Sequence, residues 1–331
     1  MLRVGIVGAG FMGALHAAGW KATPATLAGV YSLDAGMVRS VIERHGGRAY
    51  PSLDALIADV DVVDICAPTH VHREIALKAA AAGKHVVCEK PLARTVAQGE
   101  EMIAACAQAG VQLLVAHVVR YFPQYAQAKA LVDGGEVGDV AVVRLTRASF
   151  RPKREVDNWF MDTAKSGGMM LDLMLHDFDY ARWIAGEVET VFAKNVSSAR
   201  PDAPGDYALA ILRHTSGAIS NLEGAWAYPP PLFRTSLQIA GSHGLIDHPV
   251  DSAVPVRVTA MQQSAETPDI AVPASPLAEP PYTTQLKEFY AALAHGATPR
   301  VAAHDGLMAL KLAFAAIRSA ETGRPFRPQE V

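Results

Sequence analysis

The stretch VGIVGAGFMG, residues 4–13, carries three glycines in the spacing G-x-G-x-x-G. It joins a β-branched run to an alanine-rich segment, which is typical of a turn from a strand into a helix. The first glycine permits the tight bend, the second lets the backbone approach a pyrophosphate, and the third allows close helix packing. The partial positive charge of a helix N-terminus also favours phosphates. The sequence predicts a dinucleotide-binding turn, with a merely tight strand-to-helix connection as the alternative. The predicted contacts are Gly8, Gly10, Phe11, Met12 and Gly13.

Short apolar runs alternate with helix-like stretches up to about residue 121. Strand-like runs at 60–67, 84–90 and 111–117 are separated by segments rich in alanine. This alternation is typical of a parallel sheet with helices on both faces. We therefore expect residues 1–121 to form an N-terminal Rossmann NAD(P)-binding domain in an α/β protein.

The pattern changes in the second part of the chain, residues 122–331. A helix at 123–135 precedes several strands with alternating polarity, and the residues TSG at 215–217 predict a hairpin. A proline-rich segment at 271–281 predicts an extended loop before two final helices, at 283–295 and 304–322. We expect a C-terminal α/β domain with a large, mostly antiparallel open sheet. For the final two helices, packing against the first domain is an alternative to packing within the second.

Composition excludes several classes of function. With 30 Lys plus Arg against 33 Asp plus Glu, the formal charge of −3 provides no field that would attract nucleic acid or an acidic membrane. The three cysteines predict reduced thiols, and they and the scattered histidines lack metal-ligand spacing. The N-terminus lacks the pattern of an export signal, and no apolar run approaches the roughly 18 residues of a membrane helix. We expect a soluble, cytoplasmic protein without a metal.

The choice between NAD and NADP depends on the end of the second predicted strand. An acidic residue there would accept the ribose hydroxyls of NAD, but the strand ends at Ser32 and Asp34 follows two positions later. A serine could accommodate a 2′-phosphate, yet its neighbour is Leu33 and the nearest cation is Arg39, a turn into the next helix. Either cofactor fits, and Asp34 slightly favours NAD.

Open α/β sheets bind ligands at the carboxyl ends of their strands, where two further groups of residues lie. We expect the residues of these groups to contact the cofactor. The alternative for Thr69 is that it caps a helix, and the alternative for Lys90 is that it is a solvated strand terminus. Pro91 biases Lys90 to an extended conformation, which would hold its side chain over the crevice. The predicted cofactor contacts at these ends are Ala67, Pro68, Thr69, His72, Glu89 and Lys90.

The stretch GGMMLDLMLHDFD, residues 167–179, places charge in an apolar run, which is costly without partners. On a continuous helix Asp172 and His176 share one face, with Asp179 on a neighbouring edge. An Asp and His pair satisfied within the core is the alternative. Further candidates for substrate contact, by hydrogen bonding or stacking, are Arg120, Tyr121, Asn158 and Trp159, each of which could equally be a packing or hinge residue.

The segments GAGFMG (8–13), PTHVHREIALKAAAAGKHVVCEKPLA (68–93), VVRYFP (118–123) and GGMMLDLMLHDFD (167–179) occur in the order found in the Gfo/Idh/MocA family. The chain resembles that family over essentially its whole length. The resemblance implies that Lys90, Asp172 and His176 form the catalytic group. It also implies a sugar, cyclitol or related polyol as substrate, and a homodimer or homotetramer formed through the C-terminal sheet.

The resemblance leads to a hypothesis for the reaction, in which a hydride passes from the substrate to nicotinamide as the hydroxyl loses its proton. His176 is the expected base because imidazole titrates near neutral pH. Lys90 would donate to the same oxygen and Asp172 would orient the substrate or the histidine, although Lys90 could also be the proton acceptor. The alternatives are a non-catalytic NAD(P)-sensing regulatory protein and an NAD-dependent glycosidase that uses transient oxidation.

Overall fold

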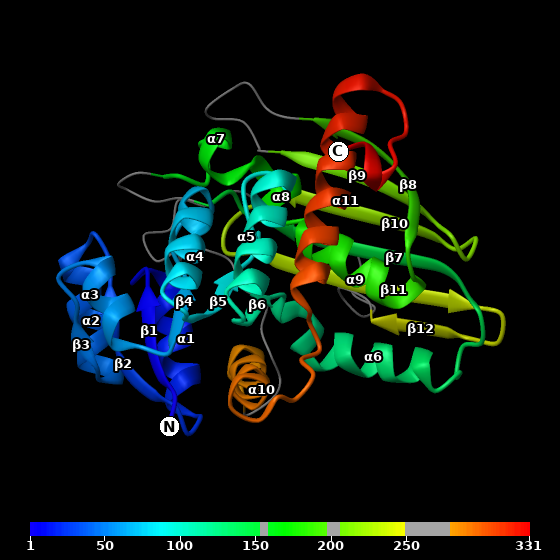
Figure 1. Cartoon of the computed structure of the whole chain (residues 1–331). Helices are drawn as coiled ribbons and strands as arrows, with labels where there is room; N and C mark the ends of the chain where they lie inside the picture. The colour runs from blue at the N-terminus through cyan, green and yellow to red at the C-terminus, as the bar shows by residue number, and fades with distance from the viewer. Residues whose placement is uncertain (153–157, 197–205, 249–278) are drawn as a thin grey trace. The chain divides into compact units, whose positions relative to one another are not determined.

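The computed structural model describes residues 1–152, 158–196, 206–248 and 279–331 (Figure 1). The chain divides into two compact units. The first unit consists of Met1–Phe122 with Pro276–Leu307, and the second unit of Pro123–Ser275 with Met308–Val331. Most of the predicted proline-rich loop, residues 271–278, lies outside the described residues.

The first unit contains a parallel six-stranded sheet with the order β3-β2-β1-β4-β5-β6. This order places a topological switch point between β1 and β4, where dinucleotides bind in Rossmann folds. The predicted fold class is confirmed. The strands are β1 (Arg3–Val7), β2 (Thr26–Tyr31), β3 (Arg48–Ala49), β4 (Val62–Ile65), β5 (His85–Glu89) and β6 (Leu113–Ala116).

Helices connect these strands, and three of them begin at side chains that accept hydrogen bonds from the first turn: Asp34, Ser52 and Thr95. The short elements β3 and α3 were not predicted from the sequence. The helices are α1 (Phe11–Lys21), α2 (Ala35–His45), α3 (Leu53–Asp59), α4 (His72–Ala81) and α5 (Val96–Gln108), with the short 3₁₀ helices η1 (Thr69–Val71) and η2 (Val118–Tyr121).

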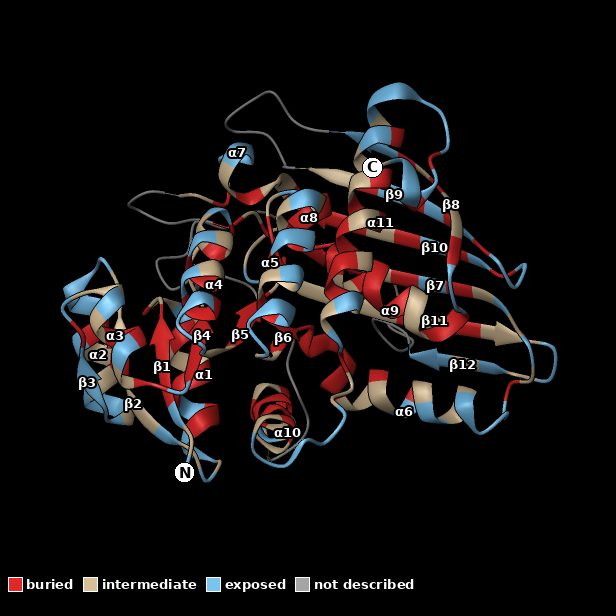
Figure 2. Ribbon diagram, in the orientation of Figure 1, coloured by how far each residue is buried: buried red, intermediate tan, exposed pale blue. Residues whose placement is uncertain are grey.

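The first unit also includes α10 (Pro281–His295), which comes from the far end of the sequence. Leu286, Phe289 and Ala292 of α10 join the same buried cluster as Trp20 and the central strands, whose residues are largely buried in Figure 2. A side chain at Gly19 would place its Cβ 2.6 Å from Cδ1 of Leu286, so glycine permits this close approach of α10 to α1. The long helix α11 (Ala303–Thr322) begins in the first unit and continues into the second.

The second unit contains a six-stranded sheet with the order β12-β11-β7-β10-β9-β8. All neighbouring pairs are antiparallel except β7 and β10, which pair in parallel, so the sheet is mostly antiparallel as predicted. The predicted hairpin at 215–217 joins β9 to β10, and Gly217 adopts φ +91 there. The strands are β7 (Val140–Ser149), β8 (Val188–Val196), β9 (Tyr207–His214), β10 (Ile219–Trp226), β11 (Phe233–Gly241) and β12 (Leu245–His248).

The prediction of one continuous helix after Gly168 is wrong. The helix α8 (Gly168–Asp172) ends at a turn, and α9 (Leu175–Ala185) begins after it. The turn residue Met174 lies over Gly224 of β10, where an added Cβ would be 2.2 Å from Cγ of Met174. A close approach between the turn and the strand therefore accompanies the interruption. The other helices of this unit are α6 (Pro123–Asp133), α7 (Thr163–Ser166) and η3 (Pro328–Glu330).

Within the described ranges, no helix combines the length and apolarity that crossing a lipid bilayer requires. Cys66, Cys88 and Cys106 all lie in described residues, and none of them forms a disulfide.

Candidate active site

The glycine turn follows β1 and leads into α1, and its three glycines occupy three different environments. Gly8 adopts φ +106, and a Cβ there would lie 2.5 Å from the carbonyl oxygen of Cys66. A Cβ on Gly13 would lie 2.0 Å from the carbonyl oxygen of Gly8. A Cβ on Gly10, by contrast, would meet no atom of the described part of the chain within 4 Å. The fold itself thus requires glycine at 8 and 13, whereas Gly10 leaves space open in front of the turn.

The start of α1 has the chemistry of a phosphate site. Gly10 is the N-cap, and it has no side chain with which to accept a hydrogen bond from the first turn of this helix. The first amides of a helix have no partner within the helix, so those that follow Gly10 are suited to bind an anion. Phe11 is exposed and Met12 is partly exposed in this first turn. The residues present therefore fit the pyrophosphate of a dinucleotide.

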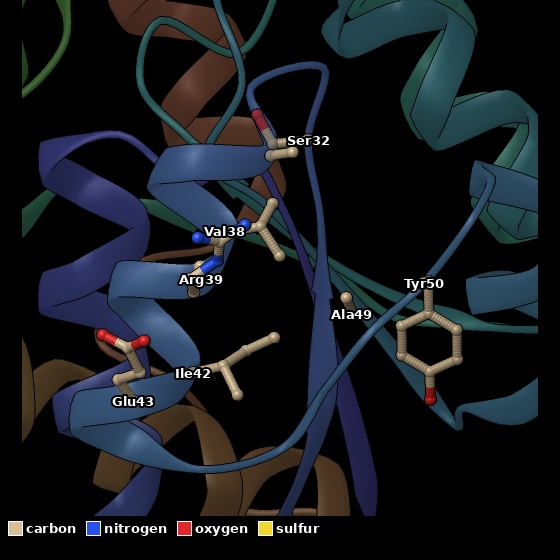
Figure 3. Close-up of a pocket in the computed structure, with 8 residues that line it drawn as sticks. Ser32, Val38, Arg39, Ile42, Glu43, Ala49 and Tyr50 are labelled. Atoms are coloured by element: carbon tan, nitrogen blue, oxygen red, sulfur yellow. The ribbon is translucent and has the colours of Figure 1, made fainter.

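The end of β2 lies beside a pocket of about 350 Å³ within the first unit (Figure 3). Ser32 lies at one end of the pocket, and Val38, Arg39 and Ile42 of α2 face the segment that carries Ala49 and Tyr50. The carboxylate of Asp34 accepts a hydrogen bond from the amide of Met37 at 3.0 Å, as the N-cap of α2. Asp34 thus has a structural partner. The polar side chains that line the pocket from the end of β2 and from α2 are Ser32, Arg39 and Glu43.

The segment after β4 places Ala67 and Pro68 at the carboxyl edge of the sheet, both partly exposed. Thr69 is buried as the first residue of η1, and the cap position of α4 belongs to Val71, so Thr69 does not cap that helix. His72 is almost fully buried, with Nε2 2.8 Å from the carbonyl of Ala67 and Nδ1 2.9 Å from that of Pro91. Burial lowers the pKa of His72. The histidine therefore ties together the segments after β4 and β5.

Glu89 and Lys90 lie at the carboxyl end of β5. Lys90 is partly exposed, whereas Glu89 is buried and its Oε2 accepts a hydrogen bond from the backbone amide of Lys90 at 3.0 Å. The other oxygen of Glu89, Oε1, lies 3.1 Å from Nε2 of His16. His16 was not predicted as a site residue, although it stands one turn after the glycine motif and α1 directs it towards the central strands.

His16 is completely buried, and its second ring nitrogen contacts Asp64 of β4. Nδ1 lies 2.9 Å from Oδ2 of Asp64, which also accepts a hydrogen bond from Nε1 of Trp20 at 2.6 Å. The donor atoms of His16, Asp64 and Cys66 lie within 4.8 Å of one another. Both nitrogens of the ring already face carboxylates, so this group is arranged for hydrogen bonding rather than for a metal ion. The signal in the sequence was the acidic residue within the apolar strand VVDI.

Arg120 and Tyr121, the candidate substrate contacts of the first unit, are buried and bond to its C-terminal segment. Nη1 of Arg120 donates to the carbonyl of Arg300 at 2.9 Å. The hydroxyl of Tyr121 donates to Oε1 of Glu288 at 2.7 Å, and the guanidinium of Arg300 lies 4.5 Å from the centre of the tyrosine ring. These contacts hold α10 and the segment after it against η2.

Asn158 and Trp159, the candidate contacts of the second unit, are partly exposed. Nδ2 of Asn158 donates to the carbonyl of Pro152 at 3.0 Å, and no donor in the described residues reaches its Oδ1. Trp159 stacks on Phe160 with ring centres 4.0 Å apart.

Asp172 and His176 flank the turn between α8 and α9. Asp172 is the last residue of α8 and is 8% exposed, whereas His176 is the second residue of α9 and is partly exposed. Every other residue from Leu171 to Tyr180 is buried, so His176 is the one partly exposed residue of this stretch, although its Nδ1 is buried. The neighbouring Asp177 instead forms a buried ion pair with Arg147 of β7.

Comparisons with known proteins agree with this architecture. Residues 2–117 match "Oxidoreductase family, NAD-binding Rossmann fold", and residues 125–247 match "GFO/IDH/MocA C-terminal domain". The chain is 31% identical over 348 residues to the myo-inositol 2-dehydrogenase of Thermotoga maritima, with 100% of this chain and 99% of that protein covered.

Two solved structures show the same fold. GenD2 from gentamicin A biosynthesis, in complex with NAD, has a TM-score of 0.85 and 27% identity, covering 98% of this chain and 96% of that one. Levoglucosan dehydrogenase in complex with NADH and levoglucosan has a TM-score of 0.83 and 25% identity, covering 98% of both chains.

The fold and the phosphate-binding turn define an oxidoreductase with an NAD-binding Rossmann domain. The chain belongs to the GFO/IDH/MocA family, and the resemblance noted in its sequence is thereby confirmed.

Proposed function

We propose that this protein oxidises a secondary hydroxyl of a sugar, cyclitol or related polyol with NAD. The observation that carries the proposal is the partly exposed Lys90 at the carboxyl end of β5, on the same edge of the sheet as the open glycine turn. Ligands of open α/β sheets bind at that edge. Relatives named for action on myo-inositol and levoglucosan support this class of substrate.

The cofactor would lie with its phosphates at the turn formed by Gly8, Gly10 and the start of α1, with Ala67 and Pro68 beside its path. When bound, NAD accepts the hydride that leaves the C–H bond of the alcohol. The chain itself would position the substrate and take up the hydroxyl proton.

The proposed catalytic group is Lys90, Asp172 and His176. His176 would accept the proton of the reacting hydroxyl, because an imidazole can be neutral and basic near pH 7. The ammonium of Lys90 would donate a hydrogen bond to the same oxygen and stabilise its developing negative charge. Asp172 would orient the substrate or the imidazole. Asn158 and Trp159 would contact other parts of a polyol by hydrogen bonding and stacking.

The test is a panel of inositols, hexoses and anhydrosugars with NAD and with NADP, followed by absorbance of the reduced nicotinamide. The variant Lys90→Met should lower kcat by about 10²-fold or more, because it removes the donor that stabilises the developing negative charge on the reacting oxygen. Its affinity for NADH, measured by fluorescence titration, should stay within about twofold, since the phosphate site is unchanged. Turnover close to wild type in Lys90→Met would overturn the proposed role.

We also propose that the protein is a homodimer or homotetramer formed through the open face of the second sheet. Leu209 and Ile211 of β9 and Ile219 of β10 are 51%, 46% and 44% exposed, which is unusual for large apolar side chains that are neighbours on one sheet. Light scattering after size exclusion should give a multiple of the chain mass of 35.2 kDa. The variant Ile211→Lys should shift the protein towards the monomer, and a monomeric wild type would exclude this assembly.

A further inference from the structure

A continuous series of hydrogen bonds joins α1 to the backbone of Lys90. Nε1 of Trp20 donates to Asp64, whose carboxylate contacts Nδ1 of His16 at 2.9 Å. Nε2 of His16 lies 3.1 Å from Oε1 of Glu89, and Oε2 of Glu89 accepts from the amide of Lys90 at 3.0 Å. We define these four side chains, Trp20, His16, Asp64 and Glu89, as the His16 network.

The His16 network is buried and polar. His16 and Asp64 have no exposed surface, and Glu89 is only 5% exposed. A carboxylate accepts hydrogen bonds but cannot donate them, so contact with one carboxylate at each nitrogen requires the ring to donate from both. His16 is then an imidazolium between two carboxylates, an arrangement in which charge-assisted bonds fix each partner.

The network ends at the residue whose side chain carries the proposed chemistry. Glu89 is the last residue of β5, and its carboxylate folds back onto the next amide, so its position determines where the backbone of Lys90 lies. Without a donor from His16, the buried Glu89 would lose its contact at Oε1 and keep only its bond to the amide of Lys90. A buried charge without partners is costly, so the carboxylate of Glu89 would turn to another orientation or take up a water molecule.

We propose that His16 is a positioning residue, which holds Glu89 and through it directs Lys90 towards the reacting hydroxyl. This inference rests on the proposed catalytic role of Lys90. The proposal adds His16 of α1 to the residues that support catalysis. It also means that Asp64 of β4, which contacts His16, affects activity as well as stability.

Two substitutions of His16 separate its two contacts. The amide nitrogen of a glutamine lies close to the position of Nε2, so His16→Gln retains a donor for Glu89 and loses the one for Asp64. The amide nitrogen of an asparagine lies close to the position of Nδ1, so His16→Asn retains the donor for Asp64 and loses the one for Glu89. If His16 had only a structural role, there would be no reason for His16→Gln, which keeps the bond to Glu89, to be a faster enzyme than His16→Asn.

We expect His16→Asn to lower kcat by about tenfold or more, since small displacements of a catalytic group have effects of this size. His16→Gln should lower kcat by less than about threefold, with KM for NAD nearly unchanged in both variants. Equal kcat values in the two variants, or an asparagine variant as fast as wild type, would overturn the proposal.

A matched control is available in the second unit. His214 is also buried, and its nitrogens bond to the carbonyl of Gly186 and the hydroxyl of Ser220, both at 2.7 Å. His214→Gln should lower the melting temperature but leave kcat at the wild-type value. A kcat loss in His214→Gln equal to that of His16→Asn would mean that any buried histidine gives the effect, which contradicts a positioning role.

A measurement without turnover completes the test. In protein labelled with ¹⁵N-lysine, the backbone amide signal of Lys90 should shift in His16→Asn and stay near its wild-type position in His16→Gln. If His16→Asn does not fold, Glu89→Gln replaces it and should show both the shifted amide and the reduced kcat. An unshifted amide with wild-type kcat would overturn the inference. If Lys90→Met remains active while the amide shifts as expected, the proposed function fails and not the network.

Discussion

Arg147 and Asp177 form a bidentate ion pair inside the second unit, with Nε 2.8 Å from Oδ2 and Nη2 3.1 Å from Oδ1. Both side chains are at most 2% exposed. Burial alone would lower the pKa of Arg147, but the adjacent charge of Asp177 outweighs it and raises the pKa. The pair joins β7 to α9 at the residue directly after His176, so it anchors the helix that presents this imidazole.

Breaking the ion pair should destabilise the fold. Asp177→Asn leaves the guanidinium buried without its charge partner, and we expect a loss of about 3–5 kcal/mol in the free energy of unfolding. Urea denaturation followed by circular dichroism measures this quantity. The double variant Arg147→Met with Asp177→Leu is the control, because apolar replacement of both partners should recover most of the loss. An Asp177→Asn protein as stable as wild type would show that the pair does not anchor α9.

The glycines of the phosphate turn should respond differently to alanine. Gly10→Ala should change the free energy of unfolding by less than about 1 kcal/mol, because its Cβ would meet no atom of the described residues within 4 Å. It should weaken NADH binding by about tenfold, which corresponds to about 1.4 kcal/mol. Gly13→Ala should destabilise the fold by about 1–3 kcal/mol through its clash with Gly8. Fluorescence titration and urea unfolding report the two effects, and equal behaviour of the two variants would contradict these roles.

Stability should depend on pH through His16. Burial, the largest effect, would lower the pKa of His16, but the charge of Asp64 and its hydrogen bond to the ring raise this pKa well above its ordinary value. Burial raises the pKa of the Cys66 thiol to about 12, so this neighbour stays protonated. A raised pKa in the fold means that stability from His16 is complete below about pH 6.5, the unfolded value, and is lost as pH rises through the folded value.

We therefore expect the free energy of unfolding to fall as the pH rises above about 6.5 towards the raised pKa of His16 in the fold, with a slope of up to about 1.4 kcal/mol per pH unit from this residue. Urea unfolding at a series of pH values measures the slope. His16→Gln should remove most of it, since an amide does not titrate. A slope that is identical in wild type and variant would assign the pH dependence to other groups.

Cofactor preference should respond to Ser32. An aspartate at the end of β2 accepts ribose hydroxyls and repels a 2′-phosphate, so Ser32→Asp should raise the ratio of the Kd for NADPH to the Kd for NADH by about tenfold or more. Fluorescence titration with each reduced cofactor measures this ratio. Asp34→Asn is the control. Asparagine also caps helices, so α2 should stay intact and the ratio of the two Kd values should change less than in Ser32→Asp. A ratio that does not change in Ser32→Asp would place the ribose elsewhere.

Local patterns in the sequence were sufficient for the Rossmann sheet. The glycine turn, the alternation of strands and helices and the hairpin at Gly217 depend on neighbours in the chain, and all three are observed. The short β3 and α3 were missed because two residues of strand and seven of helix carry little periodic signal.

Features that depend on distant contacts could not be read in advance. The break between α8 and α9 coincides with Met174 meeting Gly224, which is 50 positions later in the chain, beyond any local pattern. His16 gained its environment from β4 and β5, and the partner of Asp177 came from β7. The polar residues of the stretch 167–179 therefore divide into an anchor, Asp177, the proposed catalytic residues Asp172 and His176, and the buried Asp179. Helical spacing alone did not reveal this division.

The contribution of α10 to the first unit affects how the protein is made. Leu286, Phe289 and Ala292 complete a core that begins at Val4, so the ribosome must release nearly the whole polypeptide before the Rossmann sheet is fully covered. Nascent chains that stall earlier would leave an apolar surface beside Trp20 uncovered, a target for chaperones during synthesis.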